Sequence, residues 1–250
     1  MRRPAADTMP TLCSPARQRG YGLLEVSVVV GVLGVLSFAV TAGLENMQQL
    51  REHRHAVADA QAAVNALRGF ALRNKRLPCP ATANSAREPI GNCTQNAGWL
   101  PYESLGLAPP ATRTRMKYGV HLSATANLVA PTPTAADGLD LEHSGGFIAA
   151  LREAAASAAS NAQPFYIQES ALGATPACSG GTLINPAFVV IAPAADLGGN
   201  DRYFESSNAS FGAGSRCVVP PARVADASVD DVVVAQGSTA LLGWISNATR

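Results

Sequence analysis

An apolar run close to the start of the chain constrains the fold more than any other feature. The sequence between Arg17 and Val40 is RQRGYGLLEVSVVVGVLGVLSFAV, in which Glu25 is the one acidic residue. Residues 23–40 would form a helix of roughly 27 Å, which is long enough to cross the hydrocarbon core of a bilayer. A lone ionised carboxylate costs about 3 kcal/mol or more in that environment, so Glu25 requires a positively charged partner there.

Two common kinds of segment share part of this pattern. A simple membrane anchor carries its charges before the apolar run, as Arg17 and Arg19 do. A secretory signal peptide ends in small residues, and Val40-Thr-Ala42 is an acceptable cleavage site. Neither of them explains a glutamate just inside the start of the apolar run.

Arg-Gln-Arg-Gly20, followed by Tyr21-Gly-Leu-Leu-Glu25 and a long apolar helix, resembles the processing motif of type IV prepilins and pseudopilins. The resemblance implies that a prepilin peptidase cuts between Gly20 and Tyr21 and that the new amine of Tyr21 is methylated. It also implies that Glu25 acts in assembly. In a bundle of such helices, the terminal amine of a neighbouring subunit would pair with Glu25 and set the axial register.

The resemblance also predicts the domain organisation. Residues 1–20 are a leader that is removed, and residues 21–43 are the transmembrane and assembly half of a long helix. From 44 onward the apolar residues recur three and four positions apart, which predicts an amphipathic half over residues 44–76. Pro78 prevents the helix from continuing. Residues 77–250 are predicted to form a globular head that contains disulfides.

The head is predicted to be α+β, with an antiparallel sheet packed on the long helix as in type IV pilins. Strands in series after a helix favour this class. We predict a helix over residues 145–159 with Ser144 as its N-cap. We predict strands at residues 116–122, 164–168, 187–192, 231–235 and 240–246.

A second block follows the helix. Pro78-Cys-Pro80 and Gly98-Trp-Leu-Pro-Tyr-Glu-Ser-Leu-Gly-Leu107 resemble a segment of some large pilin-like proteins, often described as type II secretion or pilin-like. The apolar side chains of this block are expected to pack against the apolar stripe of the helix; they are Trp99, Leu100, Tyr102, Leu105 and Leu107.

The cysteines predict disulfides. Cys13 would leave with the leader, so that four remain: Cys79, Cys93, Cys178 and Cys217. An even number in an exported chain predicts two bridges, and four cysteines allow three pairings. Proximity in the sequence favours Cys79 with Cys93 and Cys178 with Cys217. The sequence has no C-x-x-C pair of the kind that binds zinc.

The sequence predicts no enzyme, because G-x-S-x-G, H-E-x-x-H and Walker motifs are absent. Removal of residues 1–20 takes away four arginines and one aspartate and leaves 15 basic and 17 acidic residues, so we expect no nucleic-acid partner. No cofactor is predicted, apart from a Ca²⁺ candidate. Asp196, Asn200 and Asp201 surround two glycines and supply oxygen ligands, although a polar turn gives the same pattern.

We therefore predict a structural subunit, of the minor kind, in a type IV pilus-like filament. Its partners would be other pilin or pseudopilin subunits, the prepilin peptidase and the inner membrane of a bacterium. It would cross that membrane once, with its head in the periplasm, before it enters a pilus or pseudopilus. One alternative is a minor pseudopilin of a type II secretion system. The other is a membrane-tethered binding or adhesion module.

Overall fold

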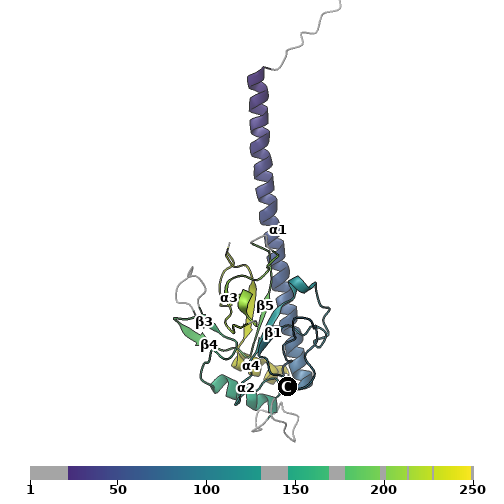
Figure 1. Ribbon diagram of the computed structural model, residues 1–250, viewed down its shortest axis with the longest axis vertical. Coiled ribbons are helices and arrows are strands. Elements are labelled where there is room, and N and C mark those ends of the chain that lie inside the picture. Colours follow the sequence, from purple (N-terminus) through teal and green to yellow (C-terminus); the bar gives the residue numbers. More distant parts are fainter. Residues whose placement is uncertain are drawn as a thin grey trace, which may run out of the picture. The chain divides into compact units, whose positions relative to one another are not determined.

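A computed structural model describes residues 22–130, 146–168, 178–197, 201–212, 214–226 and 228–248, without the side chains of residues 39–46 (Figure 1). The chain divides into two units, of which the first ends at Met47 and the second runs from Gln48 to Arg250. The predicted long helix is present as α1 (Leu23–Asn74). It ends where Lys75 adopts a left-handed backbone conformation (φ 54°), three residues before Pro78.

The last part of α1 forms one wall of the head's main core. Its buried residues lie three and four positions apart, which places them on one face of the helix. They are Ala56, Ala60, Ala63, Val64, Leu67, Phe70 and Ala71. The apolar stripe predicted from residue 44 onward is therefore buried only from Ala56 onward, because Met47, Leu50 and Val57 are exposed. The small alanine side chains allow other elements to approach the helix backbone closely.

An antiparallel sheet packs against this face, in the strand order β1-β2-β5-β6. Its strands are β1 (Ala97–Trp99), β2 (Lys117–Val120), β5 (Phe188–Ala192) and β6 (Val232–Gln236). A separate two-stranded sheet pairs β3 (Tyr166–Gln168) with β4 (Thr182–Ile184). The head is thus α+β with antiparallel pairing, as predicted.

The central strand β5 is buried on both faces. Phe188, Val190 and Ala192 belong to the main core with α1, whereas Val189 and Ile191 belong to a second cluster. This alternation follows from the two-residue period of a strand. The second cluster is built largely from the segment between β5 and β6, which therefore covers the sheet face opposite α1; it includes Phe211, Val218, Val219 and Val229.

The described part of the head also contains the helices α2 (Gly146–Ala156), α3 (Ser206–Ser210) and α4 (Ser238–Ala248). A 3₁₀ turn spans Thr112–Thr114. The prediction of a strand at residues 240–246 is wrong, because these residues lie in α4. Leu241 and Ile245 are the buried apolar residues of that segment, and their four-residue spacing fits one face of a helix. The predicted cap Ser144 lies outside the described residues.

The block after α1 packs largely as predicted. Leu100, Tyr102 and Leu105 are buried in the main core, and the Tyr102 hydroxyl accepts a hydrogen bond from the backbone N–H of Met116 at 2.8 Å. Leu107 packs against the same core. Trp99 differs, since it lies edge-on to Phe204 with ring centroids 6.1 Å apart.

Two disulfides are present, and they join the cysteines that are closest in sequence. Cys79 pairs with Cys93, and Cys178 pairs with Cys217. The first bridge closes a loop that is also held by an ion pair. Glu88 accepts two hydrogen bonds from Arg76, at 2.8 and 2.7 Å, and one from the backbone N–H of Cys79 at 3.1 Å.

We expect that replacing Cys79 and Cys93 together by alanine lowers the free energy of unfolding by about 2–4 kcal/mol. The bridge spans 14 residues, and a closed loop of that size restricts the unfolded chain by an amount in this range. Chemical denaturation of the oxidised proteins measures the difference. The matched control is the same pair of proteins under reducing conditions, where the difference should shrink if the bridge causes it.

The burial of His121 predicts that the free energy of unfolding of the head depends on pH. The residue is 2% exposed, neither ring nitrogen has a hydrogen-bond partner among the described residues, and burial lowers the pKa of its side chain. The unfolded chain therefore takes up a proton near pH 6.5 that the folded head takes up only at lower pH. Its contribution to stability is complete above pH 6.5 and is lost as the pH falls.

We expect the free energy of unfolding to fall less in His121→Leu than in the wild type when the pH is lowered from 7.5 to 5. The difference between the two proteins isolates His121, because the other titrating groups are common to both. Urea denaturation at several pH values checks this. Parallel stability curves for the two proteins would mean that His121 is not buried in its neutral form.

Candidate functional sites

The predicted processing residues fall at the start of the chain. Gly20 and Tyr21 lie outside the described residues. Glu25 is in the first turn of α1, where its backbone N–H donates to the carbonyl of Gly22 at 2.9 Å. Its side chain is exposed. Cleavage, methylation and the role of Glu25 therefore remain predictions.

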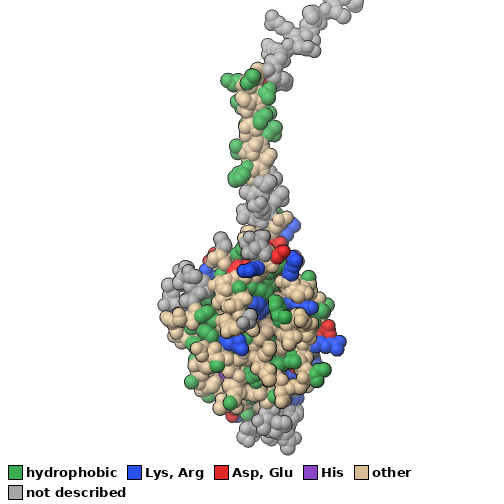
Figure 2. All heavy atoms as spheres, in the orientation of Figure 1, with side chains coloured by type: hydrophobic (Ala, Val, Ile, Leu, Met, Phe, Trp, Pro, Cys, Tyr) green, Lys and Arg blue, Asp and Glu red, His purple; other side chains and the backbone are tan. Residues whose placement is uncertain are grey.

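The first part of α1 has an apolar surface. The exposed large apolar side chains from Leu23 to Phe38 are each at least 51% exposed, and Leu23 reaches 90% (Figure 2). They occur on all sides of the helix, which is unusual for a surface surrounded by water. No helix of the described part of the chain is both apolar and long enough to cross a membrane, so the predicted transmembrane half is not confirmed.

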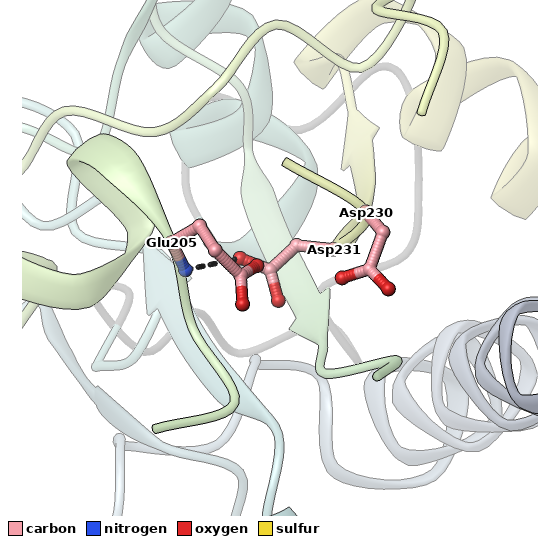
Figure 3. Close-up of side chains that lie close together, drawn as sticks. All are labelled: Glu205, Asp230 and Asp231. Atoms are coloured by element: carbon pink, nitrogen blue, oxygen red, sulfur yellow. Dashed lines mark hydrogen bonds between the residues drawn. The ribbon is translucent and has the colours of Figure 1, made fainter. Parts of the chain in front are cut away.

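Three carboxylates converge in the head. Glu205 directly precedes α3, while Asp230 and Asp231 directly precede β6. Each contributes an oxygen atom that lies within 4.8 Å of the others. Figure 3 shows the carboxylates of Glu205 and Asp231 side by side, with Asp230 next to them. All three residues belong to the connection between β5 and β6, and we call them the carboxylate cluster.

Some oxygen atoms of the carboxylate cluster have clear partners. Asp231 Oδ2 accepts from the backbone N–H of Glu205 at 3.1 Å and from Asn208 Nδ2 at 3.0 Å. Asp230 Oδ2 accepts from the backbone N–H of Ala195 at 2.9 Å. Four other oxygens are buried and have no hydrogen-bond partner among the described residues: Glu205 Oε1 and Oε2, Asp230 Oδ1 and Asp231 Oδ1.

Burial and mutual repulsion disfavour three negative charges in this place. Burial, followed by the charges of Asp231 and Asp230, raises the pKa of Glu205 to about 8. Burial raises the pKa of Asp231 to about 7, and it also raises the pKa of Asp230. Without a bound cation, the carboxylate cluster would therefore hold protons near neutral pH.

Lys117 fixes the position of α3 next to the carboxylate cluster. Its Nζ atom donates to the carbonyls of Asn208 at 2.8 Å and Ala209 at 2.9 Å, and it lies 4.7 Å from the ring centroid of Phe204. Burial lowers the pKa of Lys117 to about 8. The same lysine lines a pocket of about 680 Å³ together with Trp99 and Phe204.

The Ca²⁺ candidate from the sequence is a different set of residues. Asn200 lies outside the described residues. The backbone N–H of Asp201 donates to Asp196 Oδ2 at 2.6 Å, and Asp201 Oδ1 pairs with Arg113 Nη1 at 2.6 Å. A side-chain-to-backbone hydrogen bond and an ion pair therefore involve two residues of this pattern. Ca²⁺ binding by Asp196, Asn200 and Asp201 remains a prediction.

Sequence reasoning missed the carboxylate cluster. Glu205 is separated from Asp230 and Asp231 by about 25 residues, and their spacing matches no cation-binding loop. The adjacent pair of aspartates directly before an apolar strand was the available signal. Only the folding of the connection between β5 and β6 brings Glu205 to that pair.

Part of the chain is similar to core protein G of type II secretion systems. It is 40% identical over 62 residues to type II secretion system core protein G of Aeromonas hydrophila, which is 25% of this chain and 43% of that protein. The protein of the same name from Klebsiella pneumoniae is 39% identical over 62 residues, or 44% of its length. That of Escherichia coli K12 is 35% identical over 74 residues, or 30% of this chain and 49% of that protein.

The chain thus matches less than half the length of these curated relatives. No protein-family model and no solved structure matches it significantly.

Proposed function

We propose that the chain is a structural subunit of a pilin-like filament, and that this filament is the pseudopilus of a type II secretion system. The observation that carries the proposal is the similarity to type II secretion system core protein G. The exposed apolar surface of α1 between Leu23 and Phe38 supports it, because such a surface requires lipid or other apolar helices around it.

The path to the filament begins at the processing motif. A prepilin peptidase cuts between Gly20 and Tyr21, and the new terminus is methylated. The apolar part of α1 then holds the subunit in the bacterial inner membrane, with the disulfide-containing head in the periplasm. Two disulfides fit an oxidising compartment of this kind.

Assembly transfers the apolar surface from lipid into a bundle of like helices. Glu25 is then surrounded by apolar side chains and pairs with the terminal amine of a neighbouring subunit. The role is structural rather than enzymatic. The head, at residues 77–250, is large for the repeating subunit of a pseudopilus and suits a minor subunit.

Co-purification tests the proposal. The full chain, with a tag after Arg250, is produced in its own host, cross-linked in the membrane and purified. We expect the core protein G of that host to co-purify with it. A type IV pilus subunit would instead be found in filaments sheared from the cell surface, without core protein G. If the chain is recovered without other subunits, both from the cross-linked membranes and from the material sheared from the cell surface, a filament role is contradicted.

A further inference from the structure

The pocket lined by Trp99, Lys117 and Phe204 lies on the face of the sheet opposite α1. In the register of the sheet, Trp99 of β1 lies opposite Lys117 of β2, and Lys117 lies opposite Ile191 of β5. Residues directly opposite one another on neighbouring antiparallel strands point to the same face. Ile191 belongs to the second core cluster, so Trp99 and Lys117 also lie on the face that is turned away from α1. The pocket is thus separate from the face that packs on the helix.

The floor of the pocket is aromatic and is held in place by Lys117. The rings of Trp99 and Phe204 meet edge-on, and Lys117 Nζ lies 5.9 Å from the centroid of Trp99 and 4.7 Å from that of Phe204. The lysine is 7% exposed and donates to two backbone carbonyls of α3. Both aromatic side chains are only partly buried. The pocket therefore offers a preformed aromatic surface, which a ligand can contact at a low cost in ordering.

The rim of the pocket is polar. Its volume of about 680 Å³ lies within the range of small-molecule sites, which is about 300–1,000 Å³. Exposed hydroxyl, amide and charged side chains surround the aromatic floor: Thr82, Gln95, Thr112, Arg113, Asp201 and Arg202. Arg113 Nη1 pairs with Asp201 Oδ1 at 2.6 Å, and the two side chains are 66% and 67% exposed. This pair presents hydrogen-bond donors and acceptors side by side to a ligand.

This combination of groups is complementary to a sugar. One face of a sugar ring consists of C–H groups, which pack well on aromatic rings, and its edge carries hydroxyls that both donate and accept hydrogen bonds. Arg113 and Asp201 can satisfy such hydroxyls together. The lining contains three cationic side chains, Lys117, Arg113 and Arg202, against the single acid Asp201. This excess of positive charge favours a sugar that carries carboxylates.

The same lining suits a single-stranded nucleic acid less well. Bases also stack on aromatic rings, but these sites require a positively charged groove along the phosphates. Here Asp201 pairs with one of the rim arginines. The chain without residues 1–20 also has 15 basic and 17 acidic residues, so that its overall charge repels a polyphosphate.

We propose that this pocket is a binding site for an acidic oligosaccharide. Trp99 and Phe204 contact the C–H face of one sugar ring, and Arg113 and Arg202 bind a carboxylate of the sugar. Lys117 holds the aromatic floor in place and adds positive charge beneath it. Recognition of a carbohydrate goes beyond the proposed filament role and does not depend on it, because α1 lies against the other face of the sheet.

A calorimetric titration of the full chain in detergent micelles tests this. The acidic probes are the hexasaccharides of galacturonate, guluronate and hyaluronan, and the comparison probes are maltohexaose, which is neutral, and oligothymidylate. We expect at least one acidic hexasaccharide to bind with a Kd of about 0.1–1 mM, and maltohexaose to bind about tenfold more weakly or not at all. Absence of binding by all the acidic probes, or tighter binding of oligothymidylate, would overturn the proposal. Equal binding of maltohexaose would overturn the choice of an acidic sugar.

Variants assign the binding to the pocket. Trp99→Leu and Arg113→Gln should each weaken binding of the acidic hexasaccharide by about tenfold or more. Arg87→Gln is the matched control for Arg113→Gln, because Arg87 is also an exposed arginine in an ion pair, with Glu103, but does not line the pocket. It should bind like the wild type. Circular dichroism verifies folding, and Arg113→Gln, at an exposed position, decides the assignment if the Trp99 variant does not fold. Unchanged affinity in Arg113→Gln and in a folded Trp99→Leu would place the sugar elsewhere and overturn the assignment.

Discussion

Replacing Leu67 by alanine is expected to lower the free energy of unfolding of the head by about 2–5 kcal/mol. Leu67 is fully buried in the main core, on the face of α1 that meets the sheet. The substitution removes buried apolar surface and leaves a cavity that a close-packed core fills only in part. Denaturation of the purified chain, followed by the circular dichroism of the sheet and helices, measures the change.

The same helix offers a control with the same chemical change. Leu50 lies on α1 and is 58% exposed. Leu50→Ala should therefore alter the free energy of unfolding by less than about 0.5 kcal/mol, in part because alanine is a good helix former. Equal losses in the two variants would contradict the packing of α1 as the wall of the core.

Glu25→Ala is expected to leave cleavage after Gly20 intact and to reduce filament assembly at least tenfold. Removing one partner of a buried ion pair costs about 3–5 kcal/mol, and about 1.4 kcal/mol corresponds to a factor of ten. Cross-linking of subunits in the host membrane measures assembly, and the mobility of the processed chain reports cleavage.

The control for Glu25 is a glutamate on the same helix with no expected partner in a filament. Glu52 is exposed on the part of α1 that belongs to the head. Glu52→Ala should assemble like the wild type. Normal assembly of Glu25→Ala would mean that this carboxylate does not set the register between subunits.

Reasoning from the sequence located those helices and strands whose residue pattern lies within the element itself. The helix α1 follows from an apolar run that continues into an amphipathic stripe, and Pro78 predicts that it ends before residue 78. The strands β5 and β6 contain β-branched residues in short apolar runs, and β2 lies in a loosely alternating stretch. Their order in the sheet depends on long-range packing, which a single sequence does not reveal.

The errors in the prediction have physical causes. Residues 240–246 are apolar enough for a strand, but the fully buried Leu241 and Ile245 are four residues apart, and that spacing fits the helix α4. The strands β1 and β4 have three residues each, which is too short for a recognisable period. The carboxylate cluster was missed because its members meet only after the connection between β5 and β6 has folded.

The block from Gly98 to Leu107 shows what a local sequence pattern can predict about packing and what it cannot. Its apolar side chains, Trp99 included, were predicted to contact α1, and Leu100 and Leu105 do lie in that core. Trp99 alternates to the other face of β1 and meets Phe204, which is more than 100 residues later in the chain. The amphipathic pattern indicates which residues are buried, whereas the fold decides which surface buries them.

The start of the mature chain is the most direct test of a prepilin-like subunit. The protein is extracted from the membranes of its own host and analysed by N-terminal sequencing and intact mass. We predict a chain that begins at N-methylated Tyr21 and carries two disulfides, and is thus about 4 Da lighter than its reduced form. A chain that begins near Gly43 would identify an ordinary secreted protein and would contradict the filament role.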